Sequence, residues 1–275
     1  MIKKIVIPAA GLGTRLLPIT KEIPKEMMPL FFQNDKEILV KPIIQAIYEK
    51  FFNFGLREYC IIVGRQKRTI EDHFTSNLEL LKNFKKGSKH GNDLEKFFEM
   101  LNQSKIFWIN QHGSKGFGDA VRYSESFVGT DEFLITAGDT LLPSADKIIK
   151  KLMNSRLAGK NDAIILLKKV PDPRRFGVAV VSERKHFTQV INVEEKPKKP
   201  KSNLSIVALY RFKPSIFNAL NEVKTNKELQ LTSGIQKLID WGGNVSAIIL
   251  DENERVIDIG TADAYLETIR KRQII

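Results

Sequence analysis

Two glycines, an arginine and two lysines closely follow a short apolar run near the amino terminus, in KKIVIPAAGLGTRLLPITKEIPKEMMPL. A loop of such small residues lets backbone N–H groups approach a phosphate or the edge of a base. Arg15 adds a planar guanidinium suited to phosphate oxygens, and Lys25 adds a point charge. These residue types predict a cradle for a nucleoside triphosphate.

The loop differs from two common phosphate-binding motifs. The dinucleotide fingerprint requires a third glycine where this chain has Leu16, and the Walker loop ends in a Gly-Lys-Ser/Thr triplet that does not follow here. An ordinary strand-to-loop turn is the alternative interpretation. A turn alone does not account for Arg15, Lys25 and three prolines spaced through a charged loop.

Two later carboxylates are candidate metal ligands. Asp139 follows an apolar run in EFLITAGDTLLP, and Asp258 lies between two isoleucines in ERVIDIGTADAYLETI. Ligands of open α/β sheets bind beyond the carboxyl ends of strands, and magnesium prefers hard oxygen ligands in octahedral array. The two carboxylates, with phosphate oxygens and water, therefore predict a magnesium site. The alternatives are a turn-forming Gly-Asp for Asp139 and a helix cap for Asp258, although Thr261 is better placed to cap.

Three further segments suit a sugar phosphate and a base. NVEEKPKKPKSN supplies Glu195 beside Lys196, which could meet sugar hydroxyls and a phosphate, but taken alone it reads as a solvated charge run. Gly177, in RRFGVAVV, could let backbone approach a sugar or could be an ordinary strand glycine. Gln111, in the glycine-rich NQHGSKGFGDAV, can read a base edge with a paired donor and acceptor.

The elements that must position these residues follow from apolar periodicity. Short apolar runs predict strands at residues 4–7, 59–63, 105–109, 133–137, 163–167, 177–181, 204–210 and 245–250. Helical patterns such as VKPIIQAIYEKFFNFG lie between the early strands, which predicts a Rossmann-like, mostly parallel sheet with helices on both faces. The later strand pieces lack intervening helices and predict a small β layer over the sugar site.

Length and composition limit the remaining possibilities. The 275 residues can bury a full core, and we expect one domain over residues 1–275 with a helical insertion at about 77–103 and a carboxy-terminal extension at about 212–275. The insertion predicts two helices joined by a Lys/Gly/Ser turn. No run approaches the roughly 18 apolar residues of a membrane span, and the start MIKK lacks signal-peptide features, so a cytoplasmic protein is expected.

The single cysteine and the net charge add two expectations. Cys60 lies in the apolar run EYCIIVG, which predicts a buried structural thiol. The net charge of +12 raises the question of nucleic acid, but the basic clusters carry no interleaved aromatic residues. We therefore predict anionic small-molecule substrates and no nucleic-acid partner.

Seven segments occur in the same order as in bacterial-type UTP–glucose-1-phosphate uridylyltransferases: PAAGLGTRLLPITKEIPKEMMP, KPIIQAI, AGDTLL, FGVAVV, VEEKP, SNLSIVALYRF and LQLTSGIQKLI. The chain resembles this family over nearly its whole length, and the opening motif is typical of sugar-nucleotide pyrophosphorylases. The longer signature through KEIPKEMMP and the helical stretch at 77–103 resemble the uridylyl branch.

The resemblance implies transfer of a uridylyl group from UTP to glucose 1-phosphate, with Mg²⁺ as cofactor and a homo-oligomer (dimer or tetramer) as the assembly. It also implies a role for each matching residue. The nucleotide would contact Ala10, Gly11, Gly13, Gln111 and Gly116, and its phosphates would contact Arg15 and Lys25. The sugar would contact Gly177 and Glu195, and its phosphate would contact Lys196. Magnesium would be bound by Asp139 and Asp258.

Two departures from the family pattern keep alternatives open. Ser233 stands where the uridylyl enzymes usually have the aspartate of Gln-Leu-Thr-Asp, and DIGT at 258–261 is closer to thymidylyl and guanylyl relatives. A glucose-1-phosphate thymidylyltransferase using dTTP is therefore one alternative. A non-catalytic regulatory homologue that binds nucleotide sugars is another, and a nicotinamide oxidoreductase is disfavoured by the missing third glycine.

Overall fold

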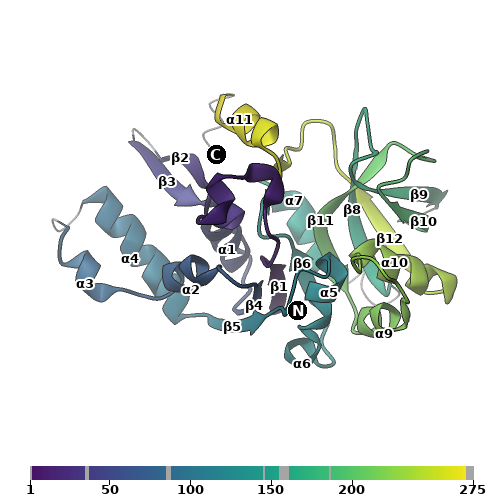
Figure 1. Cartoon of the computed structure of the whole chain (residues 1–275), viewed down its shortest axis with the longest axis horizontal. Helices are drawn as coiled ribbons and strands as arrows, with labels where there is room; N and C mark the ends of the chain where they lie inside the picture. Colours follow the sequence, from purple (N-terminus) through teal and green to yellow (C-terminus); the bar gives the residue numbers. More distant parts are fainter. Residues whose placement is uncertain are drawn as a thin grey trace.

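The computed structural model describes residues 2–34, 37–84, 88–144, 146–154, 161–185 and 187–270. Within these residues the predicted strands form one mixed sheet (Figure 1). Its first half consists of parallel neighbours in the order β5 (Lys105–Asn110), β4 (Glu58–Val63), β1 (Lys4–Pro8) and β6 (Phe133–Thr136). The order continues with β11 (Leu204–Phe212), β8 (Ala163–Lys169), β12 (Val245–Ile249), β10 (Phe187–Glu195) and β9 (Gly177–Arg184).

Helices cover both faces of this sheet because successive side chains of a strand point to opposite faces. Ile5 and Ile7 of β1 belong to the core under α1 (Ile43–Asn53), α4 (Lys89–Asn102) and α7 (Asp146–Met153). Val6, between them, belongs to the core under α5 (Phe117–Arg122), α9 (Ser215–Glu222) and α10 (Leu231–Asp240). The predicted Rossmann-like α/β fold is confirmed.

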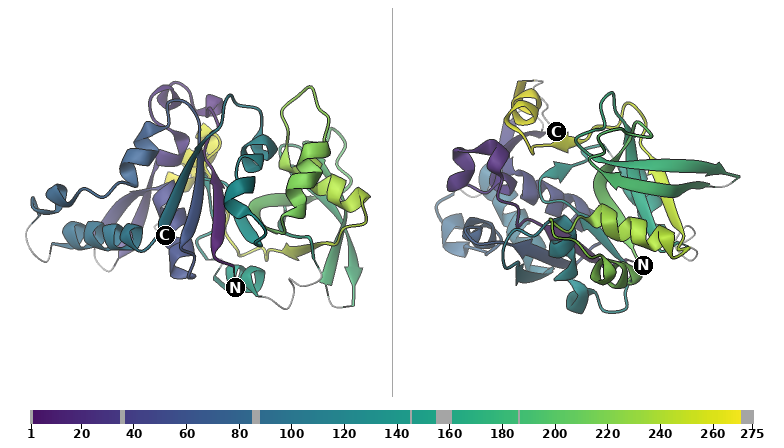
Figure 2. Two further views of the ribbon diagram at one scale, coloured as in Figure 1. Left: turned by 90° about the horizontal axis from the view of Figure 1, so that it is seen from below. Right: turned by 45° about the vertical axis from the view of Figure 1, so that its right-hand side comes forward.

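The second half of the sheet is mainly antiparallel, with β8 and β12 as its one parallel pair among the described strands. Strands β9 and β10 project as a long hairpin (Figure 2, right). The sheet curls at this end, since β9 also pairs with β11 at Ser205 and Val178. The small β layer expected from the sequence is this curled end of the same sheet.

Several short elements complete the described chain. They are η1 (Thr14–Leu16), η2 (Ile19–Lys21), η3 (Lys25–Met27), β2 (Pro29–Asn34), β3 (Glu37–Pro42), α2 (Arg68–His73), α3 (Leu78–Leu81), α6 (Glu125–Val128), β7 (Thr140–Leu141), β13 (Ile257–Asp258) and α11 (Ala262–Arg270). The pairs β2–β3 and β7–β13, and strand β10 of the large sheet, are not among the strand ranges predicted from the sequence. The two helices expected in 77–103 are α3 and α4, and residues 85–87 of their connection lie outside the described residues.

Two smaller expectations can be compared with the structure. Cys60 is fully buried, and burial raises the pKa of its thiol to about 12, which makes it an inert core residue. No helix among the described residues is both long and apolar enough to cross a membrane. The assignment of residues 1–275 to a single domain stays a prediction.

Candidate active site

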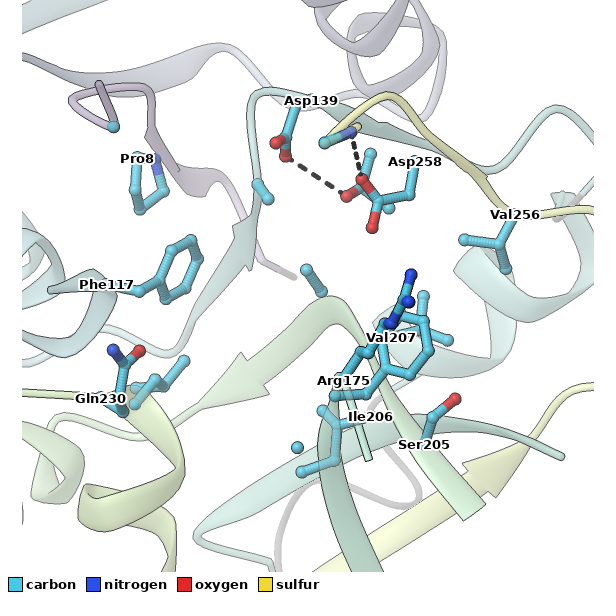
Figure 3. Close-up of a pocket in the computed structure, with 18 of the residues that line it drawn as sticks. Pro8, Phe117, Asp139, Arg175, Ser205, Ile206, Val207, Gln230, Val256 and Asp258 are labelled. Carbon is cyan, nitrogen blue, oxygen red and sulfur yellow. Dashed lines mark hydrogen bonds between the residues drawn. The ribbon is translucent and has the colours of Figure 1, made fainter. Parts of the chain in front are cut away.

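A cavity of about 790 Å³ lies beyond the carboxyl ends of the parallel strands (Figure 3). The loops after β1, β5 and β6 bound one side of it, and β9 to β11 with α10 bound the other. Eleven of the twelve residues predicted from the sequence line this cavity: Ala10, Gly11, Arg15, Lys25, Gln111, Gly116, Asp139, Gly177, Glu195, Lys196 and Asp258. Residues far apart in the chain therefore meet in one place.

Gly13 is the predicted residue that does not line the cavity. It has a left-handed backbone with φ of 66°, and a Cβ added there would lie 3.0 Å from Cγ2 of Thr20. The Thr20 hydroxyl also donates a hydrogen bond to the Gly13 carbonyl over 2.8 Å. The turn itself therefore explains this glycine, and its predicted contact with a nucleotide has no support from its position.

Lys25 and Asp139 form an ion pair at the floor of the cavity. Burial by itself would raise the pKa of the Asp139 carboxyl, but the adjacent Lys25 ammonium outweighs it and lowers that pKa. Burial likewise opposes the charge on Lys25, yet Asp139 and Glu26 raise its pKa above the usual value. Both groups are therefore charged at neutral pH.

Asp258 reaches the same end of the cavity because β13 pairs with β7. The antiparallel register sets Asp258 opposite Thr140, the residue after Asp139. Figure 3 shows both carboxyl groups on this side, with the Gly260 N–H donating to Oδ1 of Asp258 over 2.7 Å. Burial, together with the negative charge of Asp139, raises the pKa of Asp258.

Two carboxylates at one end of the cavity, where the charge of Asp139 raises the pKa of Asp258, suit a hard divalent cation. Their oxygens are the ligand type that magnesium prefers. The described residues contain no cluster of three or more His, Cys, Asp or Glu side chains that could hold a metal. Any further ligands would therefore come from substrate oxygens and water, as the sequence predicts.

A buried ion pair that sequence reasoning missed supports the loop carrying Lys25. Lys67 Nζ lies 2.7 Å from Oε2 of Glu26, and Glu26 is only 1% exposed. Burial raises the pKa of Glu26, while Lys67 opposes that shift. The pair connects the loop after β1 to the loop after β4. Glutamate is rarely buried unless it is paired, so KEMMP by itself gave no sign of this role.

Gln111 and Gly116 lie together at another end of the cavity. Nε2 of Gln111 donates to Oδ2 of Asp119 over 2.7 Å and to the Gly116 carbonyl over 3.3 Å. Gly116 has φ of 106°, and a Cβ there would lie 2.8 Å from the Leu229 nitrogen. Close backbone packing against Leu229 thus requires this glycine. Asp119 was not singled out from the sequence, where it reads as a polar residue of a short helix.

The curled end of the sheet supplies the remaining predicted residues. Thr232 Oγ1 donates to Oε2 of Glu195 over 3.1 Å, which orients that carboxylate. A Cβ at Gly177 would lie 2.8 Å from Cγ2 of Thr232, so a larger residue would disturb this contact. Lys196 Nζ lies 3.5 Å from Oε1 of Glu195. Arg175, which the sequence analysis did not select, also reaches into the cavity (Figure 3).

The geometry thus gathers the cations Arg15, Lys25 and Lys196, a carboxylate pair, the Gln111 amide and the polar Glu195–Thr232 contact around one cavity. The nucleotidyl transferase family matches residues 4–273 of the chain. The chain belongs to the nucleotidyl transferase family. This match covers all of the elements that line the cavity, from β1 to α11.

Relatives of this nucleotidyl transferase agree with the resemblance drawn from its motifs. UTP–glucose-1-phosphate uridylyltransferase of Bacillus subtilis is 38% identical over 245 residues, covering 86% of this chain and 80% of the relative. The Staphylococcus haemolyticus enzyme of the same name is 34% identical over 274 residues, covering 97% and 91%. The predicted resemblance is confirmed.

Solved structures of similar enzymes share the fold of this nucleotidyl transferase. A UDP-glucose pyrophosphorylase complexed with UDP-glucose superposes with a TM-score of 0.82 at 28% identity, covering 99% of this chain and 98% of the other. The UTP-bound enzyme from Acinetobacter baumannii gives a TM-score of 0.82 at 27% identity, covering 99% and 93%. The likeness extends over the whole cavity-forming part of the chain.

Proposed function

We propose that this protein transfers a uridylyl group from UTP to glucose 1-phosphate, giving UDP-glucose and pyrophosphate. The observation that carries the proposal is one cavity lined together by Gln111, Glu195, the cations Arg15 and Lys25, and the two aspartates. The names of the uridylyltransferase relatives, at 34% and 38% identity, support the same substrates.

The reaction needs positioning and charge neutralisation more than proton transfer. A phosphate oxygen of the sugar phosphate is already anionic near neutral pH, so it can attack the α-phosphorus in line without a general base, and pyrophosphate leaves. The two substrates repel one another, and the protein must hold them together while charge develops. In this proposal Arg15 and Lys25 bind the triphosphate, and Lys196 binds the phosphate of the sugar.

Asp139 and Asp258 are the residues that would hold Mg²⁺. The bound ion would neutralise charge on the phosphate oxygens. The Asp139–Lys25 ion pair keeps the ammonium next to the carboxylate pair, where it can serve the same phosphates. The buried Glu26–Lys67 pair supports this arrangement because it connects the loop that carries Lys25 to the loop after β4.

Thymine is the specific alternative to uracil as the base, because the DIGT segment is closer to that of thymidylyl relatives. Asp258, Gly260 and Thr261 line the cavity beside Asp139, which supports a role of DIGT at the metal site and not at the base. Uracil and thymine present the same imide edge, so their discrimination rests on one methyl group, worth about 1–3 kcal/mol in an apolar pocket.

With glucose 1-phosphate as cosubstrate, kcat/KM is expected to be modestly higher for UTP than for dTTP, and low for GTP and ATP because in this proposal Gln111 pairs with the imide edge of a pyrimidine. Measuring pyrophosphate release with each of the four triphosphates tests the proposal directly. A clear preference for dTTP would indicate a thymidylyltransferase, and a preference for GTP would contradict the base assignment. Nucleotide-sugar binding without any pyrophosphate release would indicate the regulatory homologue.

Arg175 is proposed as an additional cation for the phosphate groups of the substrates. Its guanidinium reaches into the cavity and forms no salt bridge with a described residue, whereas the preceding Arg174 is held by Asp172 over 2.8 Å. Arg175→Ala is expected to lower kcat/KM about 10- to 150-fold, the value of a hydrogen bond to a charged group. Arg174→Ala is the matched control, and equal kinetics for the two variants would rule out this role.

Location and assembly complete the proposal. We retain the cytoplasmic location and the homo-oligomeric state, dimer or tetramer, that the sequence and its resemblance imply. Small anionic substrates are the partners that the cavity supports, since its cations match phosphate groups.

A further inference from the structure

The amide of Gln111 has one fixed orientation in this structure. Its nitrogen faces two groups that can only accept hydrogen bonds, the carboxylate of Asp119 at 2.7 Å and the carbonyl of Gly116 at 3.3 Å. An amide nitrogen carries two hydrogens, and both are used in these contacts. The Gln111 carbonyl oxygen receives no hydrogen bond from a described residue, so it is the part of the amide that remains available to a ligand.

The reverse orientation is strongly disfavoured by the same neighbours. Rotating the amide by half a turn would bring its oxygen against the oxygens of Asp119 and Gly116, with no hydrogen between them. Both Gln111 and Asp119 are buried, at 7% and 8% exposure, so water does not readily replace the lost contacts. The charged Asp119 acceptor contributes more to this bias than the longer Gly116 contact.

We propose that Asp119 is a positioning residue that determines base specificity through Gln111. A lone acceptor facing the base pairs with the N3–H of uracil or thymine. Cytosine carries a lone pair at N3, so in the position of uracil it would place acceptor against acceptor, and it could reach this oxygen with its 4-amino group only by shifting in the cavity. The inference rests on the proposed function, and it adds that Asp119, which need not touch the nucleotide, is what excludes cytosine.

The Asp119→Asn variant tests the proposal with almost no change in side-chain size. An asparagine can present either its oxygen or its NH₂ group to Gln111, so the amide of Gln111 can turn and offer a donor to cytosine. The ratio of kcat/KM for UTP to that for CTP is expected to fall at least about 10-fold, in line with loss of a charge-assisted hydrogen bond. The KM for glucose 1-phosphate is expected to stay within about 2-fold, because Glu195 and Thr232 lie elsewhere in the cavity.

Two additions keep the experiment decisive. Glu125→Gln makes the same carboxylate-to-amide change at an exposed position of α6 outside the cavity, and it is expected to leave the UTP/CTP ratio unchanged. Calorimetric titration of UMP and CMP into the wild-type protein, Asp119→Asn and Asp119→Ser measures base selectivity without turnover. The difference in affinity between UMP and CMP is expected to be smaller in both variants than in the wild-type protein. Melting temperatures are recorded to show that the variants are folded.

A failure of the proposed function and a failure of the role given to Asp119 would produce different results. A wild-type protein with no UTP-dependent pyrophosphate release would overturn the proposed function itself. A wild-type preference for UTP over CTP that persists undiminished in folded Asp119→Asn would overturn the role of Asp119 alone. An equal loss of activity with both nucleotides would mean that Asp119 only supports the local structure, which also contradicts the inference.

Discussion

Asp139→Asn and Asp258→Asn are each expected to reduce turnover by roughly 10²-fold or more, the scale observed when a charge-stabilising group is lost from an active site. Both carboxylates lie at the same end of the cavity, and the β7–β13 pairing holds them together. An asparagine retains one oxygen but not the negative charge that attracts a divalent cation. Titrating Mg²⁺ into each variant while measuring pyrophosphate release gives the comparison.

The two variants should differ in stability although both lose activity. Asp139→Asn removes the partner of the partly buried Lys25 ammonium, so its melting temperature should fall. Asp258 has a raised pKa from burial and from Asp139, which means that its charged form is unfavourable in the folded protein. Replacing it by neutral Asn should therefore leave the melting temperature unchanged or higher. Comparing the two variants therefore separates the effect on activity from the effect on stability.

Asp263→Asn is the matched control, since Asp263 is exposed in the first turn of α11 and does not line the cavity. It should retain the wild-type rate and the wild-type dependence on Mg²⁺. Wild-type rates for both cavity variants, or full activity of the unmodified protein in excess chelator, would show that no metal is held by this carboxylate pair.

Lys25→Ala is expected to weaken handling of the nucleotide about 10- to 150-fold, because a hydrogen bond to a charged group is worth about 1.5–3 kcal/mol. Lys25 lies among Asp139, Glu26 and Asp258, whose charges keep it protonated, and it is a partly buried cation of the loop after β1. Calorimetric titration of UTP measures the loss directly. The KM for glucose 1-phosphate should change little.

Two further variants define the specificity of that result. Lys21→Ala removes a lysine of the same loop whose side chain is 77% exposed and which pairs with Glu22, so it should bind UTP like the wild type. Glu195→Ala should show the opposite pattern to Lys25→Ala, with sugar-phosphate handling impaired and UTP affinity retained. A collapse of UTP affinity in Glu195→Ala with normal use of the sugar phosphate would mean that the two ends of the cavity are assigned the wrong way round.

Most strands of the large sheet could be predicted because their apolar runs are continuous, whereas β10, whose apolar residues are separated by polar ones, was not. Short runs such as IVI and CIIV are typical of strands buried on both faces. The two-residue strands β7 and β13 are too short to have any periodicity, and they exist only because the chain brings them together. The β2–β3 hairpin was not predicted although LFF and ILV are apolar runs, and it lies outside the main sheet with Phe31, Ile38 and Val40 exposed.

The candidate site shows the same division between local and long-range information. Arg15, Lys25 and Asp139 stand in loops after predicted strands, so topology alone suggests that they meet. Arg174 and Arg175 are adjacent identical residues, and nothing in PRRFG indicates which one reaches the cavity. The contact of Asp119 with Gln111 likewise depends on the backbone path through Gly116, whose close packing on Leu229 involves a distant segment.

The pairing of β7 with β13 also makes the cavity depend on a segment that the large sheet does not need. A chain truncated after Leu250 would keep the loop after β1, Asp139 and every strand of the large sheet. It lacks Asp258 and α11, which lines the cavity through Ala264, Glu267 and Thr268. Such a truncated chain would keep the strands of the large sheet but lose one wall of the cavity and one of the two candidate metal ligands, so the sheet and the candidate site depend on different parts of the chain.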